Sequence, residues 1–168
     1  MSAKFQTAYG CAEVRLSMVR EDSLAASVPA EQPMLNRAEL AVDFWNGRIA
    51  TREAFNPEVE CFVVLMLDRR NRLKGWQTVS VGIATAALAH PREVFRAAIV
   101  GSASAILCMH NHPSGDPSPS AADVQLTRMI REAGAVVDIP ILDHVICGRR
   151  GADPLGKGFY SFREAGLL

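Results

Sequence analysis

Two of the four histidines in this chain lie two residues apart, directly after an apolar run. The run is Ala105–Met109, and His110 and His112 follow it with one asparagine between them. Side chains two apart on a strand point to the same side, so both imidazoles can face one point in space. Ser120 and Asp123 follow shortly afterwards. Two imidazoles and a carboxylate form a three-ligand set for zinc that leaves a fourth position for water.

The same residues also allow a simpler interpretation. Ser120-x-x-Asp123 fits a capping box, in which the serine oxygen accepts from a backbone N–H and the aspartate lies near the helix dipole. A single histidine at a strand end is usually structural. Two histidines leaving an apolar strand into a Pro/Ser/Gly-rich loop, with an aspartate at a helix start, favour the metal site.

These residues must be positioned by strands and helices that alternate along the chain. Continuous apolar runs predict buried strands at Cys61–Leu67 and Ala105–Met109. A second strand around Trp76–Val81 would complete an antiparallel hairpin. Three helices are expected: one capped by Asn36, one from Pro91 to about Gly101, and one from Ala121 to about Ala133. Gly134 is expected to end the third helix. One or two strands should follow over Val136–Leu142 and His144–Gly148. This alternation predicts an α/β fold with a mixed sheet flanked by helices.

The length of 168 residues suits one compact domain with a short arm. We place the arm and its linker at residues 1–35 and the main domain at residues 36–168. Cys11–Arg20 could form a short strand within the arm. Cys61, Cys108 and Cys147 each fall inside an apolar run, without a C-x-x-C pair, and this pattern predicts reduced buried thiols in a cytoplasmic protein.

Charge and hydropathy argue against nucleic acid and membrane as partners of this protein. Eighteen basic residues balance eighteen acidic ones, so the formal net charge is zero and nucleic acid is a disfavoured partner. No run of 18 apolar residues exists, which argues against a membrane span. The basic stretch Arg69–Lys74 could be a small phosphate patch, but an exposed, charged hairpin turn is the commoner explanation. The oligomeric state is left open by the sequence.

The stretch H-N-H-P-S-G-D-P-S-P-S-A-A-D, residues 110–123, fits the H-x-H-x7-S-x2-D signature and resembles the JAMM (JAB/MPN) metalloproteases. The complete sequence of this stretch is similar to that of the RadC branch of the superfamily. The segments His90–Val94 and Leu142–His144 are similar to RadC sequences as well. The resemblance covers roughly residues 36 to 165. It implies a three-layer MPN/JAB fold similar to that of the cytidine deaminases, whose H-x-E and P-C-x-x-C signatures are missing here.

The resemblance also implies a role for each site residue. Zn²⁺ would be held by His110, His112 and Asp123, and Ser120 would donate to the oxyanion. A catalytic glutamate is implied on the strand before the hairpin, where Glu60 is in register. Glu58 would share a face with it and is the fallback. Without the family match, Glu60 would be taken as a solvated strand start.

The implied function is a zinc-dependent peptidase or isopeptidase that acts on a peptide or protein substrate. Two alternatives remain open: a RadC-type DNA-repair-associated protein and a non-catalytic MPN interaction module. RadC proteins usually carry a helix-hairpin-helix segment before the JAB domain, and the 35 residues available here are too few for one. A two-metal nuclease would need more carboxylates than Asp123 with Asp116 nearby. His144 is expected to be outside the ligand set, either as a second layer of contacts or as a buried structural residue.

Overall fold

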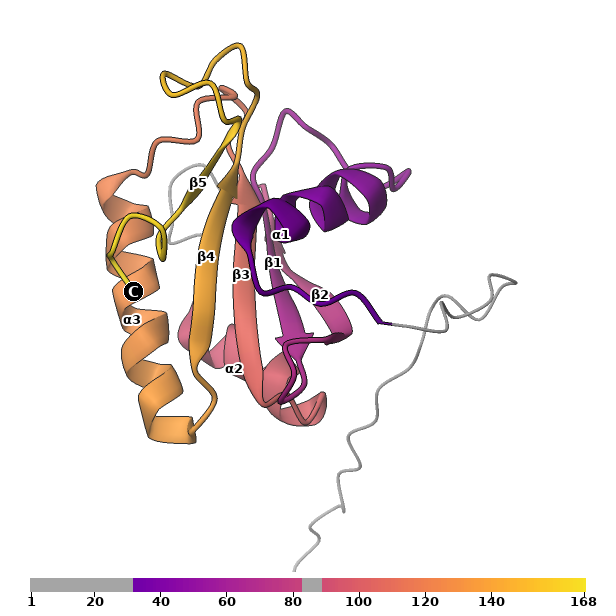
Figure 1. Ribbon diagram of the computed structural model, residues 1–168, viewed down its shortest axis with the longest axis vertical. Coiled ribbons are helices and arrows are strands. Elements are labelled where there is room, and N and C mark those ends of the chain that lie inside the picture. Colours follow the sequence, from indigo (N-terminus) through magenta and orange to yellow (C-terminus); the bar gives the residue numbers. More distant parts are fainter. Residues whose placement is uncertain (1–31, 83–88) are drawn as a thin grey trace, which may run out of the picture.

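The computed structural model describes residues 32–82 and 89–168, which form a single five-stranded sheet with helices on both faces (Figure 1). The strand expected at Cys11–Arg20 lies outside these residues. The five strands are β1 (Cys61–Leu67), β2 (Leu73–Val81), β3 (Ala105–Asn111), β4 (Ile141–Cys147) and β5 (Phe159–Ser161).

The sheet is mixed, with the strand order β2-β1-β3-β4-β5. β1 and β2 form the expected antiparallel hairpin, and β1 also pairs antiparallel with β3. β3 and β4 are parallel, and β5 adds an antiparallel edge. The predicted α/β fold with a mixed sheet is therefore confirmed.

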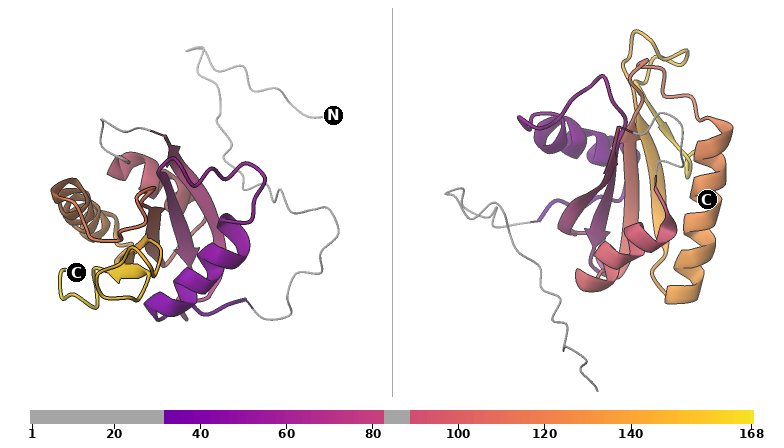
Figure 2. Two further views of the ribbon diagram at one scale, coloured as in Figure 1. Left: turned by 90° about the horizontal axis from the view of Figure 1, so that it is seen from above. Right: turned by 180° about the vertical axis from the view of Figure 1, so that it is seen from behind.

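The helices make the fold three layers thick (Figure 2). One face of the sheet is covered by α1 (Ala38–Phe44) and the π-helical turn η1 (Trp45–Ile49). The other face is covered by α2 (Pro91–Val100) and α3 (Ala121–Val137). β1 is buried along its whole length, and its residues alternate between the two cores. A strand buried on both faces reads as an unbroken apolar run, which explains the sequence of β1.

The alternation of side chains along β3 places His110 on the face of the sheet that α3 covers. Along β3, Leu107 and Met109 belong to the core beneath α1, whereas Ile106 and Cys108 belong to the core beneath α2 and α3. His110 continues the second set, because successive side chains of a strand point to opposite faces. The chain then leaves β3, forms α3 on that face and returns as β4 beside β3.

The two ends of α3 differ in how well the sequence predicted them. Its start at Ala121 is confirmed, but the helix runs through Gly134 to Val137, so the strand expected from Val136 was wrong at its start. A Cβ on Gly134 would lie 2.7 Å from the Ile139 carbonyl oxygen and 3.2 Å from the Phe95 ring. This glycine is therefore needed for close packing and does not end the helix.

Other local expectations can be checked in the same way. Pro91 occupies the first turn of α2, and His90 caps that helix by accepting from the Arg92 N–H at 3.0 Å. The cap of α1 is Arg37, without a side-chain hydrogen bond, and not Asn36 as expected. The cysteines at positions 61, 108 and 147 are free and buried, as predicted. Within the described part of the chain, no helix is long and apolar enough to cross a membrane.

Candidate metal centre

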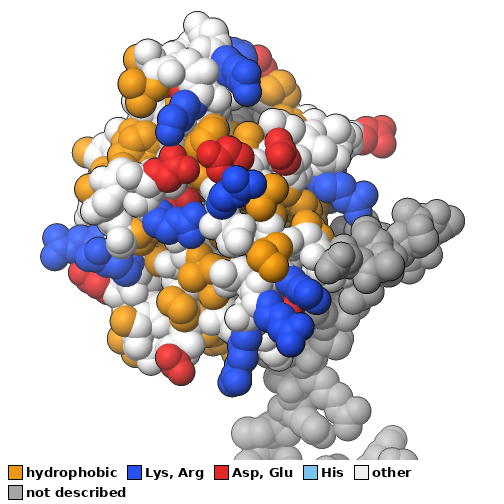
Figure 3. Space-filling view, in the orientation of Figure 1, with side chains coloured by type: hydrophobic (Ala, Val, Ile, Leu, Met, Phe, Trp, Pro, Cys, Tyr) orange, Lys and Arg blue, Asp and Glu red, His pale blue; other side chains and the backbone are white. Residues whose placement is uncertain are grey.

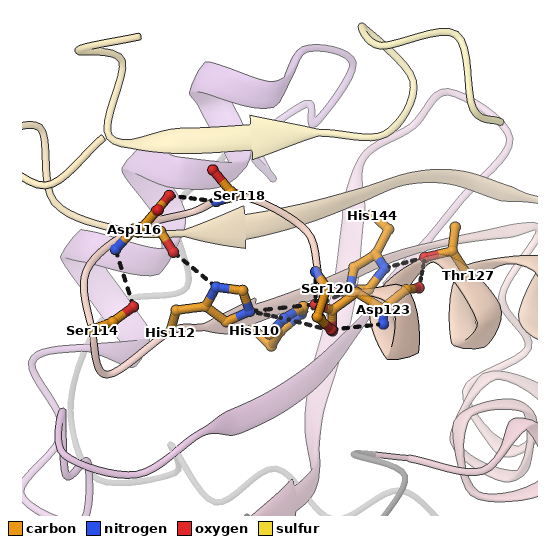
Figure 4. Close-up of polar contacts among 9 residues, drawn as sticks. All are labelled: His110, His112, Ser114, Asp116, Ser118, Ser120, Asp123, Thr127 and His144. Atoms are coloured by element: carbon orange, nitrogen blue, oxygen red, sulfur yellow. Dashed lines mark hydrogen bonds and ion pairs between the residues drawn. The ribbon is translucent and has the colours of Figure 1, made fainter. Parts of the chain in front are cut away.

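His110, His112 and Asp123 converge where β3 ends and α3 begins (Figure 4). One potential ligand atom from each lies within 4.8 Å of the other two. The Nε2 atoms of the two histidines are 3.1 Å apart, and His110 Nε2 is 3.2 Å from Asp123 Oδ1. The expected proximity of the three side chains is thus found, and a metal ion could be held between them.

The capping box predicted for Ser120 and Asp123 is present as well. Ser120 Oγ accepts from the Asp123 N–H at 3.2 Å, and Asp123 Oδ2 accepts from the Ser120 N–H at 2.7 Å. The Ser120 hydroxyl also donates to Oδ2 at 2.6 Å. The two interpretations of this motif are therefore compatible, because Oδ2 caps the helix while Oδ1 faces His110.

Asp123 Oδ1 is the buried side-chain oxygen that has no hydrogen-bond partner in the described residues. His110 Nε2 lies 3.2 Å from this oxygen, whereas His112 Nε2 lies 3.5 Å from the other carboxylate oxygen, Oδ2. His112 Nδ1 lies 2.8 Å from the Asp116 carbonyl oxygen, which can only accept, so in the neutral ring the N–H is on Nδ1 and Nε2 carries a lone pair. A buried acceptor without a donor is costly, and a cation among these atoms would satisfy it.

The charges at the site keep the carboxylate ionised. Burial would raise the pKa of Asp123, but its contacts with His110, His112 and Ser120 outweigh burial and hold that pKa below its ordinary value. Burial lowers the pKa of His110, with the charge of Asp123 opposing it only in part. Burial would also lower the pKa of His112, but Asp123 and the Asp116 carbonyl outweigh it and raise the pKa.

Glu60 lies immediately before β1 and is half-buried, whereas the fallback Glu58 is exposed. The negative charge of Glu60 opposes the burial that lowers the pKa of His110 and adds to the raised pKa of His112, so its carboxylate acts on the site electrostatically. It does not belong to the group of atoms that could share a metal ion. Of the two glutamates, Glu60 is the one whose charge acts on both histidines.

Two contacts of the site were missed by reasoning from the sequence. Asn111, between the two histidines, hydrogen-bonds to the backbone on either side of Glu60. Thr127 contacts His144, which in turn contacts His110. A signal existed for Thr127, since it lies four residues after Asp123 and therefore on the same face of α3. His144 is both fully buried and in contact with a candidate ligand.

The basic stretch Arg69–Lys74 lies far from this centre. It covers the turn between β1 and β2 and the first two residues of β2, at the end of β1 opposite to Glu60. Asp68 organises the turn by accepting from the backbone N–H groups of Arg70 and Arg72 at 2.7 and 2.9 Å. The adjacent cavity of about 490 Å³ is lined by aspartates as well as Arg69, so its charge is mixed.

Comparison with known proteins agrees with the observed fold. The model of the RadC-like JAB domain family matches residues 35–167. A UPF0758 protein of Symbiobacterium thermophilum is 46% identical over 86% of this chain and 56% of its own length. A UPF0758 protein of Thermosynechococcus vestitus is 44% identical over 73% of this chain and 47% of its own length. A UPF0758 protein of Caldanaerobacter subterraneus is 49% identical over 61% of this chain and 45% of its own length. The chain thus spans about half the length of the curated relatives it matches. It belongs to the RadC-like JAB domain family.

Proposed function

We propose that this chain is a zinc-dependent hydrolase that cleaves a peptide or isopeptide bond in a protein substrate. The observation that carries the proposal is the convergence of two imidazole nitrogens and an unpartnered, buried carboxylate oxygen. His110, His112 and Asp123 would hold the metal. A set of two nitrogens and one oxygen is typical of catalytic zinc, which keeps one position open.

Zinc bound there would act as a Lewis acid and lower the pKa of a water molecule to about 7. The candidate for the proton acceptor is Glu60, which would take the proton from the attacking water and return it to the leaving amine. Its position supports this role, because its charge already acts on both histidines. Glu60 would therefore be the general base and general acid.

Ser120 would stabilise the oxyanion that forms at the scissile carbonyl. Its hydroxyl donates to Asp123 Oδ2 at 2.6 Å, so it would have to rotate toward the substrate. The rotation leaves Oδ2 satisfied, since the backbone N–H of Ser120 also donates to it at 2.7 Å. Loss of one oxyanion donor typically lowers the rate about 10²–10³-fold.

The proposal is tested by measuring zinc content together with cleavage of peptide and ubiquitin-like substrates. We expect about one zinc per chain and turnover that chelation abolishes and added zinc restores. In Glu60→Gln, zinc content should stay unchanged while turnover falls roughly 10²–10⁴-fold, because the amide cannot accept the proton. Glu58→Gln is the matched control and should retain activity.

Each contrary outcome has a distinct meaning. Protein that stays free of metal after zinc is supplied would contradict the metal site. Full turnover in Glu60→Gln with loss in Glu58→Gln would transfer the role of general base to Glu58. Stoichiometric zinc without hydrolysis of any substrate in the screen would favour a metal-bearing interaction module over a hydrolase.

A further inference from the structure

A chain of hydrogen bonds runs from the first turns of α3 to the far side of His110 (Figure 4). Thr127 Oγ1 lies 2.7 Å from the carbonyl oxygen of Asp123 and 2.6 Å from His144 Nδ1. His144 Nε2 then lies 2.9 Å from His110 Nδ1. All four residues are buried, so water does not compete for these contacts.

The position of every proton in this chain follows from its first member. A carbonyl oxygen only accepts, so the single hydroxyl proton of Thr127 is donated to Asp123 O. Thr127 Oγ1 must then accept from His144 Nδ1–H. Because a neutral imidazole has one N–H, His144 Nε2 carries a lone pair and must accept from His110 Nδ1–H. His110 Nε2 is thereby left without a proton, which is the form that a metal ligand requires.

Aromatic packing holds the two rings in this arrangement. Phe62 stacks on His110 with ring centroids 5.9 Å apart and an interplanar angle of 16°. Phe162 stacks on His144 at 5.0 Å and 11°. The Phe162 N–H also donates to the His144 carbonyl oxygen at 3.0 Å, which ties the C-terminal segment to the same residue. The plane of each imidazole is thus fixed by a stacked phenyl ring.

We infer that Thr127 and His144 are positioning residues of the metal centre, which fix the tautomer and orientation of His110 so that its Nε2 lone pair faces the ion. The inference rests on the proposed metal site and deepens it. Residues that orient ligating histidines in this way typically contribute a factor of 10–100 to metal affinity. The contact between His144 and His110 would then have a functional consequence beyond packing.

The test compares Thr127→Val with Thr127→Ser in the full chain. Valine matches the shape of threonine but leaves His144 Nδ1–H without its acceptor, whereas serine keeps the hydroxyl. Zinc affinity is measured by titrating metal-free protein in competition with a chromophoric chelator. We expect affinity to fall about 10–100-fold in Thr127→Val and to change less than about threefold in Thr127→Ser.

A second measurement does not depend on a variant that folds. Imidazole ¹⁵N chemical shifts of the zinc-loaded parent protein report which nitrogen of each histidine carries the proton. We expect N–H on Nδ1 of both His110 and His144, and zinc on Nε2 of His110. A proton on Nε2 of His144, or equal zinc affinity in the valine and serine variants, would overturn the inference. If the parent protein binds no zinc, both the proposed function and this inference are contradicted.

Discussion

Asn111 shows how one side chain can link two parts of a site that are far apart in the sequence. The backbone pairing of β1 with β3 ends at Phe62 and His110. Beyond that point, Asn111 Oδ1 accepts from the Cys61 N–H at 2.9 Å, and its Nδ2 donates to the Val59 carbonyl at 3.0 Å. The amide therefore holds the backbone on both sides of Glu60.

We predict that Asn111→Ala loosens Glu60 more than it disturbs the metal ligands. Removing two hydrogen bonds, one buried and one partly buried, should lower the free energy of unfolding by about 1–3 kcal/mol. Zinc content should persist, because the ligand atoms are untouched, and turnover should fall. Urea denaturation and metal analysis measure the two effects, with the exposed Asn46→Ala as the matched control. A variant that keeps both stability and turnover would contradict this role.

At the residue scale, the sequence revealed the candidate ligands but not what surrounds them. His110, His112 and Asp123 lie within fourteen residues, so strand periodicity could bring the two histidines together, and the resemblance to a known signature added Asp123 to the set. Asn111 makes its contacts with residues 50 and 52 positions away, and such pairs depend on strand pairing that a single sequence does not state. The proximity of His144 to His110 likewise required the parallel pairing of β3 with β4.

At the scale of the element, α3 carries the centre at one end and backbone strain at the other. Its first turn is closed by the capping box of Ser120 and Asp123. Its last residue is followed by Asp138 in the left-handed conformation, with φ 56°. A side chain with a Cβ is disfavoured there, and a negative charge at a helix C-terminus is unfavourable as well.

We predict that Asp138→Gly stabilises the protein by about 0.5–1 kcal/mol. Glycine tolerates positive φ and removes the charge. Its larger loss of backbone entropy on folding cancels part of this stabilisation. Asp138→Ala is the control that removes the charge but keeps the Cβ, so it should be less stable than the glycine variant. Thermal and chemical unfolding of the three proteins would show the order, and an alanine variant equal to or above glycine would refute it.

The end of α3 also shows why local signals predicted this element only in part. A glycine near the end of a helical pattern usually marks its C-terminus. Gly134 instead lies within the helix, because the Ile139 carbonyl and the Phe95 ring pack against it. A glycine that ends a helix and a glycine required by close packing look the same in the sequence. Only the packing of α3 against its neighbours distinguishes them.

At the scale of the whole molecule, the surface charge is balanced. The formal net charge is zero, and the face shown in Figure 3 carries both basic and acidic side chains, with one group of basic side chains at its lower right. Affinity for duplex DNA depends largely on basic side chains that neutralise phosphates. The basic turn between β1 and β2 is itself organised by Asp68, which reduces its positive field.

We therefore predict weak or no binding of this chain to duplex DNA at ~150 mM salt. Fluorescence anisotropy with a labelled duplex, repeated over a range of salt concentrations, measures the affinity. Replacing Arg69 and Arg70 by glutamine should leave the result unchanged. Submicromolar affinity that these replacements abolish would show that the turn is a phosphate-binding surface.

The unpartnered oxygen of Asp123 has a consequence for the amount of protein that a cell maintains. A buried acceptor without a donor costs about 1–3 kcal/mol, and a bound ion removes that cost. An ion that binds the folded chain alone adds about 2.7 kcal/mol when its free concentration is 100 times its dissociation constant. Changes of 1–2 kcal/mol alter steady-state abundance several-fold, because proteases remove unfolded chains. With the metal site proposed above, the lifetime of this protein would rise and fall with the supply of zinc.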